Sequence, residues 1–138
     1  MFVNTLSQKT FEALDDTARA LLENAVTPAG TRFSFSILDG GDAETLSRLI
    51  LSAASYLDRD ENDEIDLLSL DVFKSEESGD FIVDADLAVG GPTIRARYES
   101  RWDSLEITAC WGSDTVQIYQ GRDATSDLKD QLAEFGSM

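Results

Sequence analysis

Apolar residues recur at helical spacing in three stretches of the chain, and each stretch predicts a helix. The first helix is expected over Leu6–Val26, opening near the capping-box pair Thr5 and Gln8. A second is expected after Asp42, a good N-cap residue, and a third over Asp123–Phe135. The residues expected to face the core are Phe11, Leu14, Ala18, Leu21, Leu22 and Ala25 in the first, Leu46, Leu49, Ile50, Ala53, Ala54 and Leu57 in the second, and Leu128, Leu132 and Phe135 in the third.

Alternating apolar and polar residues between turn signals predict strands in the rest of the chain. The expected strands are Arg32–Leu38, Ile65–Phe73, Asp80–Val89, Thr93–Tyr98, Leu105–Trp111 and Thr115–Tyr119. The order of elements is α-β-α-β-β-β-β-β-α. It predicts a single α+β domain over residues 1–138, with an antiparallel meander of about five to six strands and two or three helices packed on one face.

The predicted turns bring charged residues of neighbouring strands together. A tight turn at Gly90–Gly91 and a second near residues 101–102 predict three cross-strand pairs: Asp86 with Arg95, Asp84 with Arg97, and Arg97 with Glu106. Opposite charges facing each other across strands contribute roughly 0.2–1 kcal/mol each. These arginines are therefore expected to be structural, which leaves fewer cations to balance the other acids.

The predicted strands and turns also indicate where both tryptophans and the cysteine lie. Trp111 falls on the apolar side of its strand and is expected in the core, whereas Trp102 lies near a turn and is a candidate interface anchor. Cys110 falls on the polar side. Without a histidine or an evident basic neighbour to activate this thiol, we expect a packing role rather than a nucleophilic one.

Composition narrows the class of protein. The 138 residues are enough for one core, and a hydrophobic content of 42% argues against disorder. No apolar run approaches the roughly 18 residues that a membrane span needs, and the N-terminus lacks the pattern of a secretory signal. The single cysteine cannot form an internal disulfide, so a reducing cytoplasm is the expected location.

The chain has no histidine, which removes the commonest general base and metal-binding nitrogen. It also lacks a phosphate-binding loop and a paired-cysteine motif. Among so many acids some pair of carboxylates always lies at catalytic separation, so such a pair says little. We therefore expect a protein that is not an enzyme and has no cofactor.

The strong excess of acidic residues limits the possible partners most. Acidic residues outnumber basic ones by 27 to 11, and the formal net charge is −16. Ten carboxylates lie between residues 58 and 80, opposed there only by Arg59 and Lys74. They are Asp58, Asp60, Glu61, Asp63, Glu64, Asp66, Asp71, Glu76, Glu77 and Asp80. Because such a body repels nucleic acid and anionic membranes, we expect neither as a direct partner.

Part of this acidic window resembles the first nine positions of an EF-hand calcium loop. The resemblance implies ligands at Asp58, Asp60, Asn62, Glu64 and Asp66. It departs from the motif at Asp63, where the turn needs glycine, and at Ser69, where the motif has a bidentate glutamate. The loop is a candidate calcium site only, no metal is expected, and the alternative is a solvated acidic turn.

The charge is large enough to imitate nucleic acid. Sixteen charges correspond to about 27 Å of duplex DNA, and a compact chain of this length has a diameter of about 37 Å. We expect the partner to be a basic nucleic-acid-binding protein. This chain would inhibit it as a DNA or RNA mimic of the anti-restriction or anti-CRISPR kind. The acidic surface expected to bind it consists of Asp39, Asp42, Glu44, Asp58, Asp60, Glu61, Asp63, Glu64, Asp66, Glu76 and Glu77.

Two other functions agree with the sequence. One is an acidic cytoplasmic adaptor, such as a secretion chaperone or a toxin-immunity protein, which would show an apolar groove. The other is a housekeeping protein of a halophile, because aspartate exceeds glutamate and arginine exceeds lysine. The partner's identity and the oligomeric state stay open.

Overall fold

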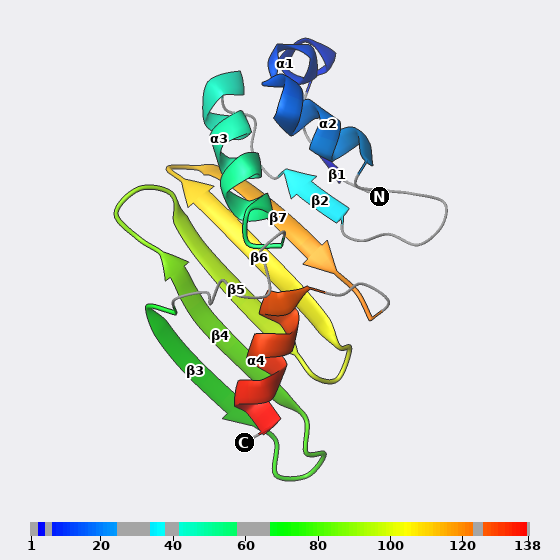
Figure 1. The fold of residues 1–138 in the computed structure, drawn as a ribbon, viewed down its shortest axis with the longest axis vertical. Helices are drawn as coiled ribbons and strands as arrows, with labels where there is room; N and C mark the ends of the chain where they lie inside the picture. Colours follow the sequence, from blue (N-terminus) through cyan, green and yellow to red (C-terminus); the bar gives the residue numbers. More distant parts are fainter. Residues whose placement is uncertain are drawn as a thin grey trace.

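The computed structural model describes residues 3–4, 7–24, 34–37, 42–57, 67–122 and 126–137. Within them, one sheet carries helices on one of its two faces (Figure 1). The helices are α1 (Gln8–Ala13), α2 (Asp16–Asn24), α3 (Ala43–Ala54) and α4 (Asp127–Ser137). The strands are β1 (Val3–Asn4), β2 (Ser34–Ile37), β3 (Ser69–Lys74), β4 (Phe81–Ala88), β5 (Thr93–Glu99), β6 (Ser104–Trp111) and β7 (Asp114–Gln120). The α+β class is confirmed.

The sheet has the strand order β1-β2-β7-β6-β5-β4-β3. Strands β3 to β7 form the predicted antiparallel meander, in which each strand pairs with the next one in the chain. β2 extends it by pairing antiparallel with β7, and the short β1 adds in parallel to β2. The sequence did not predict β1, because two residues carry no periodicity.

The core lies between one face of the sheet and the helices. Alternate residues of the central strands are buried on this face, as Val83 and Ala85 are in β4 and Ile107 is in β6. Helix α3 packs on β6 and β7, while α4 packs on β3, β4 and β5. The α3 residues predicted for the core are all buried: Leu46, Leu49, Ile50, Ala53, Ala54 and Leu57, the last just beyond the helix end.

The first predicted helix is wrong in one respect, because the chain forms two helices rather than one. Leu14 ends α1 in an extended conformation, with φ −64° and ψ 154°. The Asp15 carboxylate then accepts a hydrogen bond of 2.9 Å from the backbone N–H of Thr17, at the start of α2. Local capping at Asp15 therefore breaks an apolar stripe that runs on from Leu14 to Ala18, both of which are buried.

The expected burial of Trp111 is also wrong. The residue lies on the same side of β6 as the buried Ala109, as the alternation predicts, but 51% of its surface is exposed. Trp111 is the last residue of β6 and pairs with Asp114 across the turn into β7. Alternation fixes the face on which a side chain lies, whereas burial also requires an element above it.

Helix α4 lies close against the sheet at Gly136. This glycine is buried, and the Phe81 ring at the start of β4 occupies the space that a Cβ atom would need. The absence of a side chain at Gly136 therefore allows the last turn of α4 to lie against β4. The position of α4 matters because this helix presents acidic residues on its outer side.

We expect Gly136→Ala to lower the free energy of unfolding by about 1–3 kcal/mol, the usual cost of overpacking. The matched control is Gly121→Ala, whose added Cβ would meet only the Tyr119 ring at an ordinary 3.6 Å. Urea unfolding of both variants measures the difference. Equal stability of Gly136→Ala and the wild type would contradict this packing.

Candidate functional site

Most of the acidic surface predicted from the sequence lies outside the described residues. These residues are Asp39, Asp58, Asp60, Glu61, Asp63, Glu64 and Asp66. The candidate calcium loop, with Asn62, lies outside them as well. Four members of the predicted surface are described: Asp42, Glu44, Glu76 and Glu77.

Asp42 and Glu44 stand at the beginning of α3. The Asp42 carboxylate caps the helix by accepting hydrogen bonds from the backbone N–H of Thr45 at 2.8 Å and from its hydroxyl at 3.2 Å. These bonds, the backbone one first, lower the pKa of Asp42. Glu44 forms an exposed ion pair with Arg48 at 3.8 Å. Asp42 therefore has a structural role in addition to its charge.

Glu76 and Glu77 lie in the turn between β3 and β4, and both are exposed. Figure 1 shows this turn at the lower end of the molecule, whereas α3 begins at the upper end. The described members of the predicted surface thus form two separate groups. Further exposed acids lie on α4, which runs toward the end of the sheet that carries the β3–β4 turn.

Helix α4 supplies acids that the sequence analysis did not include. Asp127, Asp130 and Glu134 are exposed and spaced three and four residues apart, which places them on one side of the helix. Figure 1 shows α4 running toward the end of the sheet that carries the β3–β4 turn. We call these three residues, together with Glu76, Glu77 and Asp80 of the turn, the α4–turn acidic group. The three-and-four spacing of these acids is a signal that the sequence itself carries.

The lysine within α4 has its charge directed inward. Lys129 is buried, with its Nζ atom 2.9 Å from the Gly121 carbonyl oxygen and 3.2 Å from the Asp103 carboxylate. Asp103 also accepts a hydrogen bond of 2.7 Å from the Tyr98 hydroxyl. Burial opposes the ionisation of Asp103, but the bonds from Tyr98 and Lys129 outweigh it and lower its pKa. This cluster anchors α4 to β5 and to the β5–β6 turn.

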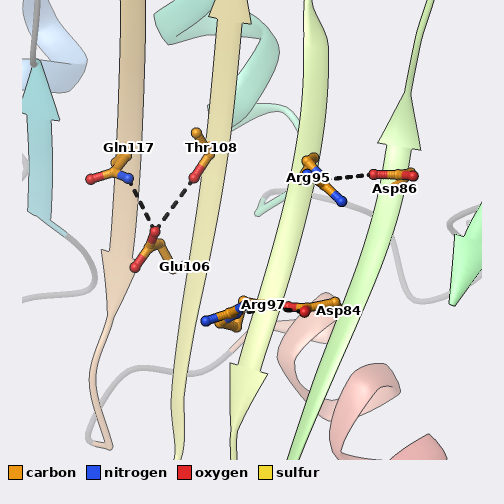
Figure 2. Close-up of polar contacts among 7 residues, drawn as sticks. All are labelled: Asp84, Asp86, Arg95, Arg97, Glu106, Thr108 and Gln117. Atoms are coloured by element: carbon orange, nitrogen blue, oxygen red, sulfur yellow. Dashed lines mark hydrogen bonds and ion pairs between the residues drawn. The ribbon is translucent and has the colours of Figure 1, made fainter. Parts of the chain in front are cut away.

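The face of the sheet opposite the helices is polar, and its charges are paired as predicted. Arg97 Nε lies 2.7 Å from the Asp84 carboxylate, and Arg95 Nε lies 2.8 Å from that of Asp86 (Figure 2). Both pairs stand directly opposite each other on β4 and β5, which confirms the predicted register. Asp84 raises the pKa of Arg97, and a hydrogen bond from the Ser69 hydroxyl lowers that of Asp86, assisted by Arg95.

The polar face extends on both sides of these pairs. Glu106 lies opposite Arg97 on β6, as predicted, and accepts hydrogen bonds from Gln117 at 3.1 Å and Thr108 at 3.5 Å (Figure 2). On the other side, Asp71 of β3 lies opposite Asp84 and is exposed. No ion pair to Asp71 is found among the described residues, so its charge is uncompensated there.

Cys110 lies on the polar face, as predicted, with its Sγ atom 3.6 Å from the Thr115 hydroxyl. In the described ranges, no three acidic or thiol side chains gather as metal ligands. No helix in that part of the chain has the length and apolar character to cross a membrane.

No protein-family model matches the chain, and comparisons with curated proteins and with solved structures find no significant match. A function therefore has to be argued from the charge and geometry of the side chains themselves.

The cluster of Tyr98, Asp103 and Lys129 that anchors α4 should make the free energy of unfolding depend on pH. Burial, followed by the hydrogen bond to Asp103, raises the pKa of Tyr98 to about 12. Because the folded pKa exceeds the unfolded value of about 10, this stabilisation is complete below pH 10 and is lost as the pH rises toward 12. We expect Tyr98→Phe to cost about 1 kcal/mol near neutral pH and to reduce the alkaline loss of stability.

Urea unfolding of the wild type and of Tyr98→Phe, repeated between pH 7 and about pH 12, measures this effect. Tyr119→Phe is the control, because that ring is 47% exposed. An alkaline loss of stability that is the same in the wild type and in Tyr98→Phe would show that Tyr98 is not buried as described.

Proposed function

We propose that this protein is a non-catalytic, cytoplasmic inhibitor that binds a basic nucleic-acid-handling protein in place of DNA or RNA. The proposal rests on a difference between two regions of the fold: charges are paired on the polar face of the sheet and exposed on α4 and the β3–β4 turn. Arginines on the polar face are bound to Asp84 and Asp86, whereas the α4–turn acidic group has exposed carboxylates. Much of the net charge of −16 is thus available to a partner.

The spacing of the helical acids supports the same function. Residues 127, 130 and 134 span about 10 Å along the helix at 1.5 Å per residue, or one carboxylate every ~5 Å. One strand of DNA carries a phosphate every ~3.4 Å of axis. The two linear densities are of the same order, so a groove that binds a phosphate backbone offers cations at a usable spacing. Residues 58–66 remain part of the proposed surface.

One observation favours the adaptor as a second candidate. Leu68, Leu70, Val72 and Phe73 are exposed on or beside β3, and an adaptor needs apolar surface for its client. Such a complex would depend on apolar contact and would change little with salt. A mimic would release its partner as the salt concentration rises, because exposed charges are screened.

The first test is capture of partners from a cell lysate on the immobilised protein, at salt concentrations of about 50 and 500 mM. We expect a bound protein with a basic isoelectric point that is largely released at the higher salt. A captured protein that is not basic, or binding that ignores salt over this range, would contradict the mimic and favour the adaptor.

The second test neutralises acids in matched pairs, with affinity for the captured partner as the readout. Glu77→Gln with Glu134→Gln alters the α4–turn acidic group, and Glu12→Gln with Glu23→Gln removes the same charge from α1 and α2. Each exposed ion pair contributes about 0.2–1 kcal/mol, so losing two pairs should weaken binding of the first variant by about twofold to thirtyfold. The second should bind like the wild type. Equal loss in both variants would mean that net charge alone determines affinity.

A further inference from the structure

Among the described residues, strand β3 forms one edge of the sheet. It ends the strand order of the sheet, and each of its six residues is exposed. Apolar side chains are nevertheless concentrated there, with Leu68 and Phe73 both 56% exposed. Exposed apolar edges invite pairing with another strand, and natural proteins usually protect them.

The hydrogen-bond pattern shows which backbone groups β3 presents. Ser75 donates its N–H to the Asp80 carbonyl at 2.8 Å, which identifies residues 75 and 80 as a hydrogen-bonded pair in the β3–β4 register. Such pairs recur at every second residue of an antiparallel ladder, so the odd-numbered residues of β3 bond to β4. The N–H and C=O groups of Leu70 and Val72 therefore point away from β4, toward the open edge.

The two sides of β3 differ in chemistry. Leu70 and Val72 pair with the buried Ala85 and Val83, so they lie on the side of the sheet that α4 covers. Asp71 lies on the opposite, polar side, where Asp84 is already bound to Arg97. A strand added to this edge thus meets apolar side chains on one side and an uncompensated carboxylate on the other.

Charge argues against a second copy of the chain at this edge. Two copies that each carry −16 repel one another. A two-fold pairing that keeps the polar faces together also places Asp71 opposite or diagonal to its own copy, where like charges destabilise a sheet. The same charges favour a basic occupant.

We propose that β3 is the docking edge for an extended segment of the basic partner, with apolar residues alternating with lysine or arginine. The segment adds to the sheet as a further strand and bonds to the backbone of Leu70 and Val72. Its apolar side chains lie beside Leu70 and Val72, and a basic side chain lies beside Asp71. This inference rests on the proposed function and names the element of the partner that is recognised.

The polar side has room for long side chains at the end of β3. A cavity of about 470 Å³ opens there, lined by Phe73, Asp80, Phe81, Glu99 and Trp102 among others. Arg101 already stacks on the Trp102 ring, with its guanidinium carbon 4.9 Å from the ring centre. A second basic side chain, beside Phe73, would border this cavity and meet its carboxylates and aromatic rings, although Lys74 and Arg101 also line it.

The test uses two capped peptides of about nine residues, a usual strand length. In one peptide Val and Lys alternate, and in the other the same residues are grouped in blocks. Affinity is measured by calorimetry, and amide exchange of Leu70 and Val72 is followed by NMR. We expect the alternating peptide to bind and to slow exchange at both amides, and the grouped peptide to bind more weakly.

Val72→Pro removes the outward N–H without removing a bond to β4, which edge strands tolerate. We expect it to weaken binding of the alternating peptide by about tenfold, the equivalent of one lost backbone hydrogen bond. Val72→Ala, which keeps the N–H, should bind more tightly than Val72→Pro. Should Val72→Pro fail to fold, Asp71→Asn is compared with Glu23→Gln, which removes equal charge; only Asp71→Asn should weaken binding.

Three results would overturn the docking edge. They are equal binding of the two peptides, wild-type affinity in both Val72→Pro and Asp71→Asn, and a concentration-dependent dimer of the wild type that Val72→Pro abolishes. Failure of the proposed function is distinguishable. If a basic partner is displaced by nucleic acid but binds Val72→Pro as tightly as the wild type, the docking edge is excluded and the mimic stands. If the alternating peptide binds at β3 but no basic partner is displaced by nucleic acid, the mimic is excluded and the docking edge stands.

Discussion

The two-residue alternation of side chains in β4, β5 and β6, held in one register from Ile82 to Asp86 and shifted only between Asp86 and Ala88 in the β4–β5 pair, is the constraint on which the rest of the structure depends. It sends Val83, Ala85 and Ile107 into the core beneath the helices, and Asp84, Arg97 and Glu106 onto the open face. A shift of one residue in register would exchange the two sets, bury charges and expose the core. The same register brings Arg95 opposite Asp86 and Arg97 opposite Asp84. Folding and charge pairing are therefore determined together.

Much of the fold follows from the sequence because its determinants are local. The apolar stripe of α3, the glycine turns and the alternation of the meander are all short-range signals, and they predicted the register of Asp84 with Arg97. The break at Leu14 was missed because the apolar spacing continues across it. The pairing of β2 with β7 joins distant segments, and no local pattern specifies it.

The candidate site was predictable only in part. The paired arginines were expected, and their positions are confirmed. Asp42 was predicted both as an N-cap and as part of the acidic surface, and the N-cap is confirmed, because its carboxylate caps α3. Asp130 and Glu134 were missed because their relevance depends on where α4 packs, which is a tertiary property. The exposure of Trp111 was not predicted either, because burial depends on which elements pack above a residue.

Charge that stabilises the fold is distinct from charge available to a partner, and we propose that the second kind occupies a nucleic-acid site. Elution of the captured partner by duplex DNA or RNA tests it most directly, with polyglutamate of equal total charge as the control. We expect release by the nucleic acid at concentrations where polyglutamate releases little. A partner that stays bound in saturating nucleic acid, or that both polymers release equally, would contradict it.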